Sequence, residues 1–163
     1  MTFTISPGTS DDSRHIVASS AALFASDAGR HDPAATNLDW PQQEGAAYYN
    51  ALMASPDDLV LLARDGHNVA GHLVGRLTGP SSVRPIRVAV LESVHVYADY
   101  RGRGAGGQLV AAFMGWAADK GAQRAVVTAY AANEGAQRFY VRHGFAPQSV
   151  TLCLDGLPPA RIS

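Results

Sequence analysis

The sequence predicts an α/β fold with mixed α and β elements, in which one mostly antiparallel sheet is covered by helices on both faces. Two apolar runs, residues 59–63 and 68–77, flank the dipeptide Asp65-Gly66, which favours a tight turn between antiparallel strands. Residues 88–143 then alternate strand and helix patterns, as expected when further strands join the same sheet. The chain has 163 residues, 47% of them hydrophobic, which suits one domain with a single core.

The first sixty residues are expected to form one short strand and two helices. Residues 2–5 alternate as a strand does, and Ser10 can cap a helix over residues 11–24. Prolines and polar side chains interrupt residues 25–41, so we expect a loop there. A second helix is expected over residues 41–54, because it would begin with a proline, which is favoured in a first turn.

The middle of the chain is expected to form a strand, a helix and a second strand. Residues 88–96 are a long apolar run rich in valine, which indicates the third long strand after the hairpin. A glycine-rich turn follows at residues 100–107, and residues 108–120 have the apolar spacing of a helix. Residues 125–129 read as a short buried strand.

The last part of the chain is expected to form one helix and one final strand. The helix covers residues 134–143 and ends at Gly144, whose missing side chain permits a left-handed conformation. Residues 150–154 read as a strand, and residues 156–163, which contain two prolines, read as a tail. The single cysteine, Cys153, excludes an internal disulfide, and its apolar neighbours indicate a buried strand thiol rather than a nucleophile.

The glycine-rich turn is the strongest functional feature of the sequence. Its small residues would let the backbone pass close to a ligand, and the N–H groups that open the following helix would face that ligand without partners. Two arginines in the turn indicate an anion with more than one charge, since a guanidinium can bind two phosphate oxygens at once. The turn consists of Arg101, Gly102, Arg103, Gly104, Ala105, Gly106 and Gly107.

Two sequence blocks carry a resemblance to a known family. Arg101-x-x-Gly104-x-Gly106 resembles the pyrophosphate loop of the GNAT family, the Gcn5-related N-acetyltransferases. The second block resembles the family's other motif, and the two lie in the expected order at the expected separation within residues 88–146. It reads Asn133-x-x-Ala136-x-x-Phe139-Tyr140-x-x-x-Gly144-Phe145.

The resemblance implies the three-layer αβα acyl-CoA N-acyltransferase fold, with central strands that splay apart, as one N-acetyltransferase domain over residues 1–163. Acetyl-CoA would be the co-substrate, bound by a core over residues 88–146, and residues 1–60 would form the acceptor side. Backbone groups of Val94 and Val96 would pair with the pantetheine arm, with His95 between them in the same strand segment. Asn133 would contact the arm from the other side, and the amides of the glycine-rich turn would wrap the pyrophosphate.

Glu92 is the candidate base for the implied reaction, direct attack of a primary amine on the acetyl thioester through a tetrahedral intermediate. An amine with a pKa near 10.4 is protonated at neutral pH, so its proton needs an acceptor. Alternation places Glu92 on the face of Val94 and Val96 unless a bulge intervenes, and it places His95 on the opposite face in a packed or hydrogen-bonded role. In the alternative, a chain of water molecules accepts the proton, and Glu92 forms an ion pair with Arg87 or another surface arginine.

Tyr140 is the candidate acid. The tyrosine at this position of the family motif protonates the departing thiolate, and a phenol with a pKa near 10 is protonated at neutral pH. The alternative is a purely aromatic role, in which Tyr140 packs against Phe139 and Phe145.

The family places the acceptor pocket near residues 25–49, and this segment is rich in acids and aromatic rings. Acids can hold an ammonium group and aromatic rings can stack on it, so a small-molecule or peptide amine is expected. Residues 1–60 carry eight acids against two arginines and the remainder six acids against eleven bases, which suits a cationic acceptor and an anionic co-substrate. Equally, the aromatic residues could form the apolar side of the second helix. The candidates are His31, Asp32, Trp40 and Tyr48.

Other classes of function find less support. Gly102-x-Gly104-x-x-Gly107 also matches the dinucleotide-binding fingerprint, but roughly 90 residues precede it and no acid ends the next strand. A non-catalytic module that binds CoA as a sensor or partner is the remaining alternative.

Partners and surroundings are constrained mainly by what the sequence lacks. The six histidines show no spacing typical of metal ligands, so no metal is expected. No sustained basic stripe suggests a nucleic acid, and no apolar run of membrane-spanning length or signal peptide is recognisable. We therefore expect a cytoplasmic protein, as a monomer or homodimer.

Overall fold

The computed structural model describes residues 2–161, which form a five-stranded sheet in the order β1-β2-β3-β4-β5. The first four strands pair antiparallel, and β5 pairs parallel with β4. The sheet is thus mixed and mostly antiparallel, as predicted. Its strands are β1 (Thr4–Pro7), β2 (Asp58–Asp65), β3 (Asn68–Thr78), β4 (Val88–Val96) and β5 (Arg124–Val127). The helices are α1 (Ser13–Ser26), α2 (Ala28–His31), α3 (Ala46–Ala54), α4 (Ala105–Asp119) and α5 (Glu134–Arg142).

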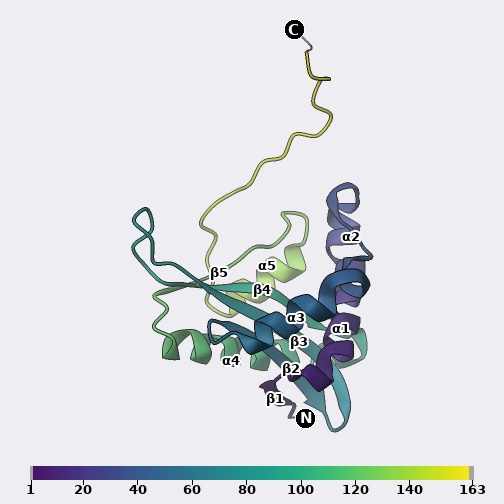
Figure 1. Ribbon diagram of the computed structural model, residues 1–163, viewed down its shortest axis with the longest axis vertical. Coiled ribbons are helices and arrows are strands. Elements are labelled where there is room, and N and C mark those ends of the chain that lie inside the picture. The colour runs from purple at the N-terminus through teal and green to yellow at the C-terminus, as the bar shows by residue number, and fades with distance from the viewer. Residues whose placement is uncertain (1, 162–163) are drawn as a thin grey trace.

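Helices cover both faces of the sheet. Figure 1 shows α1 and α3 in front of the strands, with α4 and α5 behind them. The front layer packs through Ile16 and Leu52 onto Leu62 of β2, and all three side chains are buried. The rear layer packs through Phe113 of α4 onto Leu91 of β4, together with apolar residues of α5. The predicted αβα layering is therefore confirmed.

The segment between the first two long helices is more ordered than the sequence suggested. The loop expected over residues 25–41 contains the short helix α2 and a 3-10 turn at Pro33–Ala35. The second predicted helix begins at Pro41 with a π-helical turn, Pro41–Gly45, and continues as α3. A stack of Trp40 on Phe24, with ring centroids 5.6 Å apart, ties this segment back to α1.

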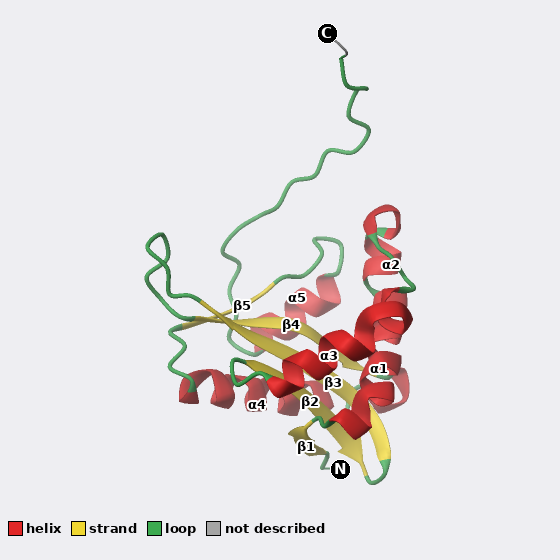
Figure 2. Cartoon of the chain, viewed as in Figure 1, coloured by secondary structure: helices red, strands yellow, loops and turns green. Residues whose placement is uncertain are grey.

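The two central strands part after a short parallel pairing. The bounds of β4 agree with the prediction, but β5 pairs only with Val88–Leu91 before it ends at Val127. Figure 2 shows β5 diverging from the rest of β4. The second half of β4 therefore has an edge that β5 does not cover, as the family resemblance implied.

A β-bulge at Glu92 reverses one prediction. Leu91 pairs with Gly75 of β3 and Ser93 with the adjacent Val74, so Glu92 is an extra residue in β4. Val94 packs with the α4 layer, whereas the carboxylate of Glu92 accepts a hydrogen bond from Tyr48 of the α1–α3 layer. The expectation that Glu92 shares a face with Val94 and Val96 is wrong, because the bulge shifts the alternation by one residue.

The end of the chain also differs from the prediction. Residues 146–161 have no regular secondary structure and run away from the body of the protein (Figure 1). The strand expected over residues 150–154 is therefore absent from the described structure, and Cys153 is exposed rather than buried. The alternation of this segment is typical of a strand, but no neighbouring strand supplies its hydrogen bonds. Residues 162–163 of the expected tail lie outside the described residues.

Candidate active site

The glycine-rich turn leads directly from β4 into α4. Gly102 and Gly104 have φ angles of 77° and 89°, which belong to the left-handed region that glycine adopts without steric cost. The first hydrogen bond of the helix runs from Gln108 N to Gly104 O at 3.0 Å, so the amides from Gly104 to Gly107 have no acceptor within α4. A Cβ atom on Gly102 would meet nothing within 4 Å. The turn is therefore an open cradle of N–H donors.

The last two glycines of the turn have a packing role. A Cβ atom on Gly106 would lie 3.2 Å from the ring of Phe139, and one on Gly107 would lie 3.1 Å from the ring of His143. Both rings belong to the α5 segment, so the absence of side chains lets α5 approach the start of α4. The second motif is thereby held next to the first.

The backbone of β4 presents polar groups to the gap beside β5. Tyr97 N donates to Ala70 O of the β3 segment at 2.9 Å. Because backbone groups alternate in direction along an antiparallel strand, the N–H and C=O groups of His95 also face β3. Val94 and Val96 then present their N–H and C=O groups to the gap. The Val96 carbonyl already accepts a hydrogen bond from Arg101 Nε at 3.0 Å, which ties the turn to the strand.

Tyr140 is held within the rear layer among aromatic rings. It contacts Phe139 and Phe145 in edge-to-face geometry, with ring centroids 5.3 and 5.7 Å away. Burial, followed by the negative charge of Asp27, raises the pKa of Tyr140 to about 12. The phenol is therefore protonated across the neutral range, and it has the aromatic packing that was its alternative role.

Asn133 connects α5 to α1. Its side-chain oxygen accepts a hydrogen bond from Ala136 N at 3.0 Å and so caps α5, while its amide donates to Asp27 Oδ1 at 3.1 Å. Asp27 immediately follows α1 and was not singled out from the sequence, although it lies within the predicted acceptor segment. No motif marked this acid, because its importance depends on contacts with residues more than 100 positions away.

His31 and Asp32 lie at the same junction of α1 and α5. His31 Nε2 is 3.9 Å from Asp27 Oδ1, and its ring stacks on Tyr130 with centroids 5.3 Å apart. Burial, followed by the charges of Asp27 and Asp32, raises the pKa of Tyr130. Two acids and two aromatic rings therefore meet beside the end of α1.

Tyr48 and Glu92 come together on the front layer of the sheet. Tyr48 donates to Glu92 Oε1 at 2.6 Å, and Arg76 lies 4.0 Å from the same oxygen. Burial and the hydrogen bond to Glu92 raise the pKa of Tyr48 to about 12. Arg76, rather than Arg87, is the arginine beside Glu92, and it is also bound to Asp58 at 3.0 Å.

Trp40 belongs to an aromatic cluster with Tyr48 and Tyr49. Its ring centroid lies 5.2 Å from that of Tyr48 and 6.0 Å from that of Tyr49, both in edge-to-face geometry. Tyr49 is only 4% exposed, and Trp40 and Tyr48 pack partly buried against the same core. The aromatic residues thus form the apolar side of the α3 segment, and Tyr48 also reaches Glu92.

His95 is packed and hydrogen-bonded, as alternation predicted. Its Nδ1 lies 3.1 Å from the Ser19 hydroxyl of α1, which also contacts Nδ1 of His72 at 2.5 Å. Burial, followed by the charge of Arg101, lowers the pKa of His95 to about 4, and burial, followed by His95, lowers that of His72 to about 3. Both rings are neutral at neutral pH.

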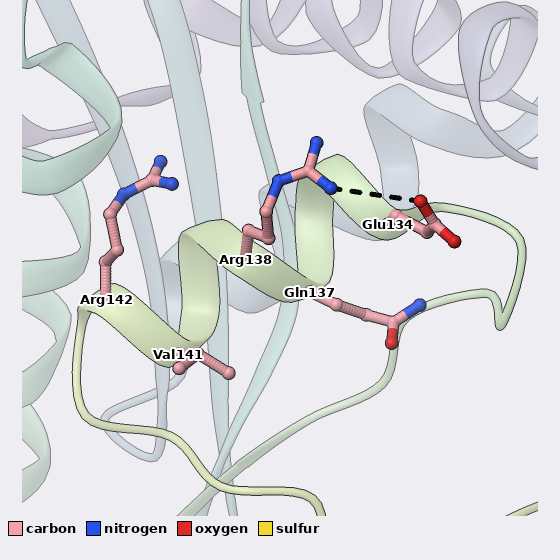
Figure 3. A pocket seen from close by; sticks show the side chains of 5 residues that line it. All are labelled: Glu134, Gln137, Arg138, Val141 and Arg142. Atoms are coloured by element: carbon pink, nitrogen blue, oxygen red, sulfur yellow. Dashed lines mark ion pairs between the residues drawn. The ribbon is translucent and has the colours of Figure 1, made fainter.

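A hollow of about 380 Å³ on the outer face of α5 is separate from all of these groups. Figure 3 shows that it is lined by one helix alone and spanned by an ion pair of 3.9 Å between Glu134 and Arg138. Phe139 and Tyr140 pack into the core instead. The hollow is a surface feature of one helix and contains none of the predicted site residues.

The described part of the chain shows neither a cluster of metal ligands nor a membrane-spanning helix. Within residues 2–161, no three His, Cys, Asp or Glu side chains gather closely enough to hold a metal ion. None of the helices described is both long and apolar enough to cross a bilayer.

Comparisons with known proteins agree with this geometry. The sequence profile of the "Acetyltransferase (GNAT) family" matches residues 27–145. No curated protein sequence matches the chain significantly.

Similar solved structures cover nearly the whole chain. A transcriptional regulator from Bacillus halodurans C-125 is 22% identical with a TM-score of 0.74, over 95% of this chain and 100% of that one. The aminoglycoside N-acetyltransferase AAC(6')-Iy in complex with CoA is 17% identical with a TM-score of 0.74, over 95% of each chain. A ribosomal-protein-alanine N-acetyltransferase from Brucella melitensis biovar Abortus 2308 is 16% identical with a TM-score of 0.69, over 95% and 99%.

Proposed function

Because this chain belongs to the acetyltransferase (GNAT) family, whose profile matches residues 27–145, we propose that it transfers an acetyl group from acetyl-CoA to a primary amine. Acetyl-CoA, when bound, supplies the activated acetyl thioester. The acceptor is a small-molecule or peptide amine.

The open cradle of amides at the start of α4 is the observation that carries this proposal. Four N–H groups that have no acceptor within α4, from Gly104 to Gly107, suit the pyrophosphate oxygens of CoA, and the positive end of the helix dipole adds to their attraction. Arg101 and Arg103 flank this cradle with exposed side chains. The residues present therefore fit the phosphate part of the co-substrate.

The edge of β4 beyond Leu91 fits the pantetheine arm. Val94 and Val96 present backbone groups to the gap, so an extended, amide-containing arm could pair there as an added strand does. Asn133 lies at the start of α5, but its side chain is already bound to Asp27 and Ala136. We therefore assign the arm chiefly to β4.

Glu92 is the proposed acceptor of the amine's proton. Its carboxylate lies beside the ring of Tyr48, which in turn contacts the ring of Trp40, so an ammonium group could be held by charge and by the aromatic faces before it loses its proton. Tyr48 cannot take that proton, since its pKa near 12 keeps the phenol protonated. The role of Tyr48 is to orient Glu92.

Tyr140 is proposed to stabilise the departing thiolate by donating a hydrogen bond. A pKa of about 12 keeps the donor proton in place at neutral pH. A thiol, taking cysteine as a proxy, has a pKa near 8.5, so complete transfer from Tyr140 would be uphill by about 5 kcal/mol. Donation without full transfer avoids most of this cost.

An acceptor screen tests the proposal. The protein is incubated with acetyl-CoA and a panel of primary amines, and release of the free thiol is followed. At least one amine is expected to give turnover, and Tyr140→Phe should lower kcat by roughly 100-fold, the low end for loss of one hydrogen-bond donor to a developing negative charge. Binding of acetyl-CoA by this variant, measured by calorimetry, should change little.

The possible results separate the candidate functions. Tight acetyl-CoA binding without turnover of any amine would favour a non-catalytic CoA-binding module. Absence of acetyl-CoA binding, or stabilisation of the protein by NAD but not by CoA, would contradict the proposal altogether.

A further inference from the structure

A cluster of polar side chains lies between α1 and the sheet, within the largely apolar front layer. The Ser19 hydroxyl is 2.5 Å from Nδ1 of His72 and 3.1 Å from Nδ1 of His95. Nε2 of His72 is in turn 3.3 Å from the Ser93 hydroxyl. Ser19 and both histidines are buried, and buried polar groups are costly unless they are hydrogen-bonded. These four residues, the polar network, therefore favour the one arrangement in which their hydrogen bonds form.

The shared hydroxyl requires both imidazole rings on one face of the sheet. A hydroxyl donates one hydrogen bond and accepts others, so Ser19 satisfies both Nδ1 atoms when one ring carries its proton there and the other does not. His72 of β3 and His95 of β4 are directly opposite in the register. Ser93 precedes His95 by two residues and therefore lies on the same face. Two positions of β4 are thus bound to the front layer.

These contacts depend on the bulge at Glu92. Leu91 packs with the α4 layer, and the extra residue in β4 lets Ser93 and His95 face α1. Without that extra residue, regular alternation from Leu91 would turn Ser93 and His95 into the apolar α4 layer. There they would lose Ser19 as a partner, and unpaired polar groups in a core are costly. The polar network thus distinguishes the bulged register from the regular one.

We propose that the polar network positions the functional half of β4 by holding the bulge at Glu92 in place. Its members are positioning residues that act through the backbone of β4 rather than on the substrates. This role rests on the proposed function, which assigns the amine's proton to Glu92 and the pantetheine arm to the edge of β4.

Both parts of the proposed site depend on the bulged register. In that register Glu92 reaches Tyr48, and the backbone groups of Val94 and Val96 face the gap beside β5. In the regular register the backbone groups of Val94 and Val96 would turn toward β3, because the direction of hydrogen bonding alternates along a strand. The edge offered to the pantetheine arm would then be lost.

Nuclear magnetic resonance measures the register of β4 without any ligand. Overhauser contacts between opposite backbones should place Val74 against Ser93 in the wild-type protein. Ser19→Ala leaves two buried imidazole nitrogens without their shared partner, which should disfavour the bulged register by roughly 10-fold or more. A second set of contacts, between Val74 and Glu92, is then expected. Contacts of Val74 with Ser93 alone in this variant would overturn the proposal.

Ser20→Ala is the matched control. Ser19 and Ser20 are adjacent in α1 and are 0% and 1% exposed, but the Ser20 hydroxyl is hydrogen-bonded to that of Tyr49 at 2.7 Å. This variant loses a buried hydrogen bond of the same helix, so it should lose stability while β4 keeps its wild-type register. A second register in both variants would show that loosening of α1, rather than the polar network, controls β4, which contradicts the proposal.

Calorimetric binding of acetyl-CoA provides the functional readout. The Kd should rise in proportion to the population that leaves the bulged register, so a bulged register populated to one half would about double the Kd. An unchanged Kd in a variant whose register has shifted would contradict the proposed role. If the wild-type protein itself does not bind acetyl-CoA, the proposed function fails, while the contacts of Val74 still decide whether the polar network holds the bulge.

Variants of Ser93 guard against a failure of Ser19→Ala to fold, because Ser93 is only half-buried. Ser93→Ala removes the partner of His72 Nε2 and should also shift the register and raise the Kd for acetyl-CoA. Ser93→Thr keeps the hydroxyl and should restore both wild-type values. Equal registers and equal Kd values for the two variants would overturn the proposal.

Discussion

At the residue scale, the bulge at Glu92 places a carboxylate against Tyr48 rather than beside Val94. We expect Glu92→Gln to lower kcat by roughly 100-fold or more, because the amide cannot accept the amine's proton. The KM for acetyl-CoA should change little, since Glu92 lies on the other face of the sheet from the packed side chain of Val94.

A matched variant separates the carboxylate from its hydrogen-bond donor. Tyr48→Phe removes the 2.6 Å hydrogen bond but leaves Glu92 in place, so the loss in kcat should be smaller than that for Glu92→Gln. The pH–rate profile provides the second readout. If Glu92→Gln keeps the wild-type pH–rate profile and the wild-type kcat, a water chain rather than Glu92 removes the proton of the amine.

The sequence could nominate candidate residues but could not describe their surroundings. Tyr140 could be identified because its motif is local, with fixed spacing to Asn133 and Phe145. The face of the sheet on which Glu92 lies could not be predicted, because the bulge is set by the register with β3. That register depends on residues that are distant in the sequence. Asp27 was missed for the same reason: the hydrogen bond that it accepts from Asn133 and the effect of its charge on the pKa of Tyr140 exist only after folding.

At the scale of elements, β3 has no room for a side chain against β4 at Gly71. A Cβ atom there would collide with the carbonyl oxygen of His95, and only movement of the backbone could relieve this clash. We expect Gly71→Ala to lower the free energy of unfolding by about 3 kcal/mol or more, at or above the upper part of the range for overpacking.

Gly115 provides the matched control for that substitution. It lies within α4, where a Cβ atom would meet nothing within 4 Å, so Gly115→Ala should raise the free energy of unfolding by about 1 kcal/mol through helix propensity. Urea denaturation of the two variants measures both changes. Equal stability of the two variants would show that the close contact at Gly71 is absent.

Element prediction succeeded where the local pattern and its partner agree. The run over residues 88–96 is a strand in both descriptions, because β3 is available through the adjacent hairpin. The alternation over residues 150–154 is just as strong, yet the described chain offers it no paired neighbour. A strand needs a second strand, so its local pattern alone cannot decide the outcome.

At the scale of the whole molecule, stability should depend on pH through two buried histidines. Their folded-state pKa values, about 3 for His72 and about 4 for His95, lie below the ordinary value of 6.5. The unfolded chain therefore binds more protons than the folded one below pH 6.5, so stability is complete above that pH and falls as the pH decreases toward 4.

Urea unfolding at a series of pH values measures this dependence. Each histidine should contribute a slope of up to about 1.4 kcal/mol per pH unit within this window. Replacement of His72 and His95 together by Gln should flatten the curve, whereas replacement of the exposed His67 should not. A wild-type curve that is flat from pH 6.5 to 4 would contradict the assigned burial.

The arrangement of the two layers has a consequence for the order of events in catalysis. The amide cradle and Tyr140 belong to the α4–α5 layer, while Glu92 and the Trp40 cluster belong to the α1–α3 layer. Donor and acceptor can therefore enter from opposite sides of the sheet, and neither has to depart before the other arrives. We therefore propose a ternary complex with sequential kinetics, without an acetylated protein as a resting stage.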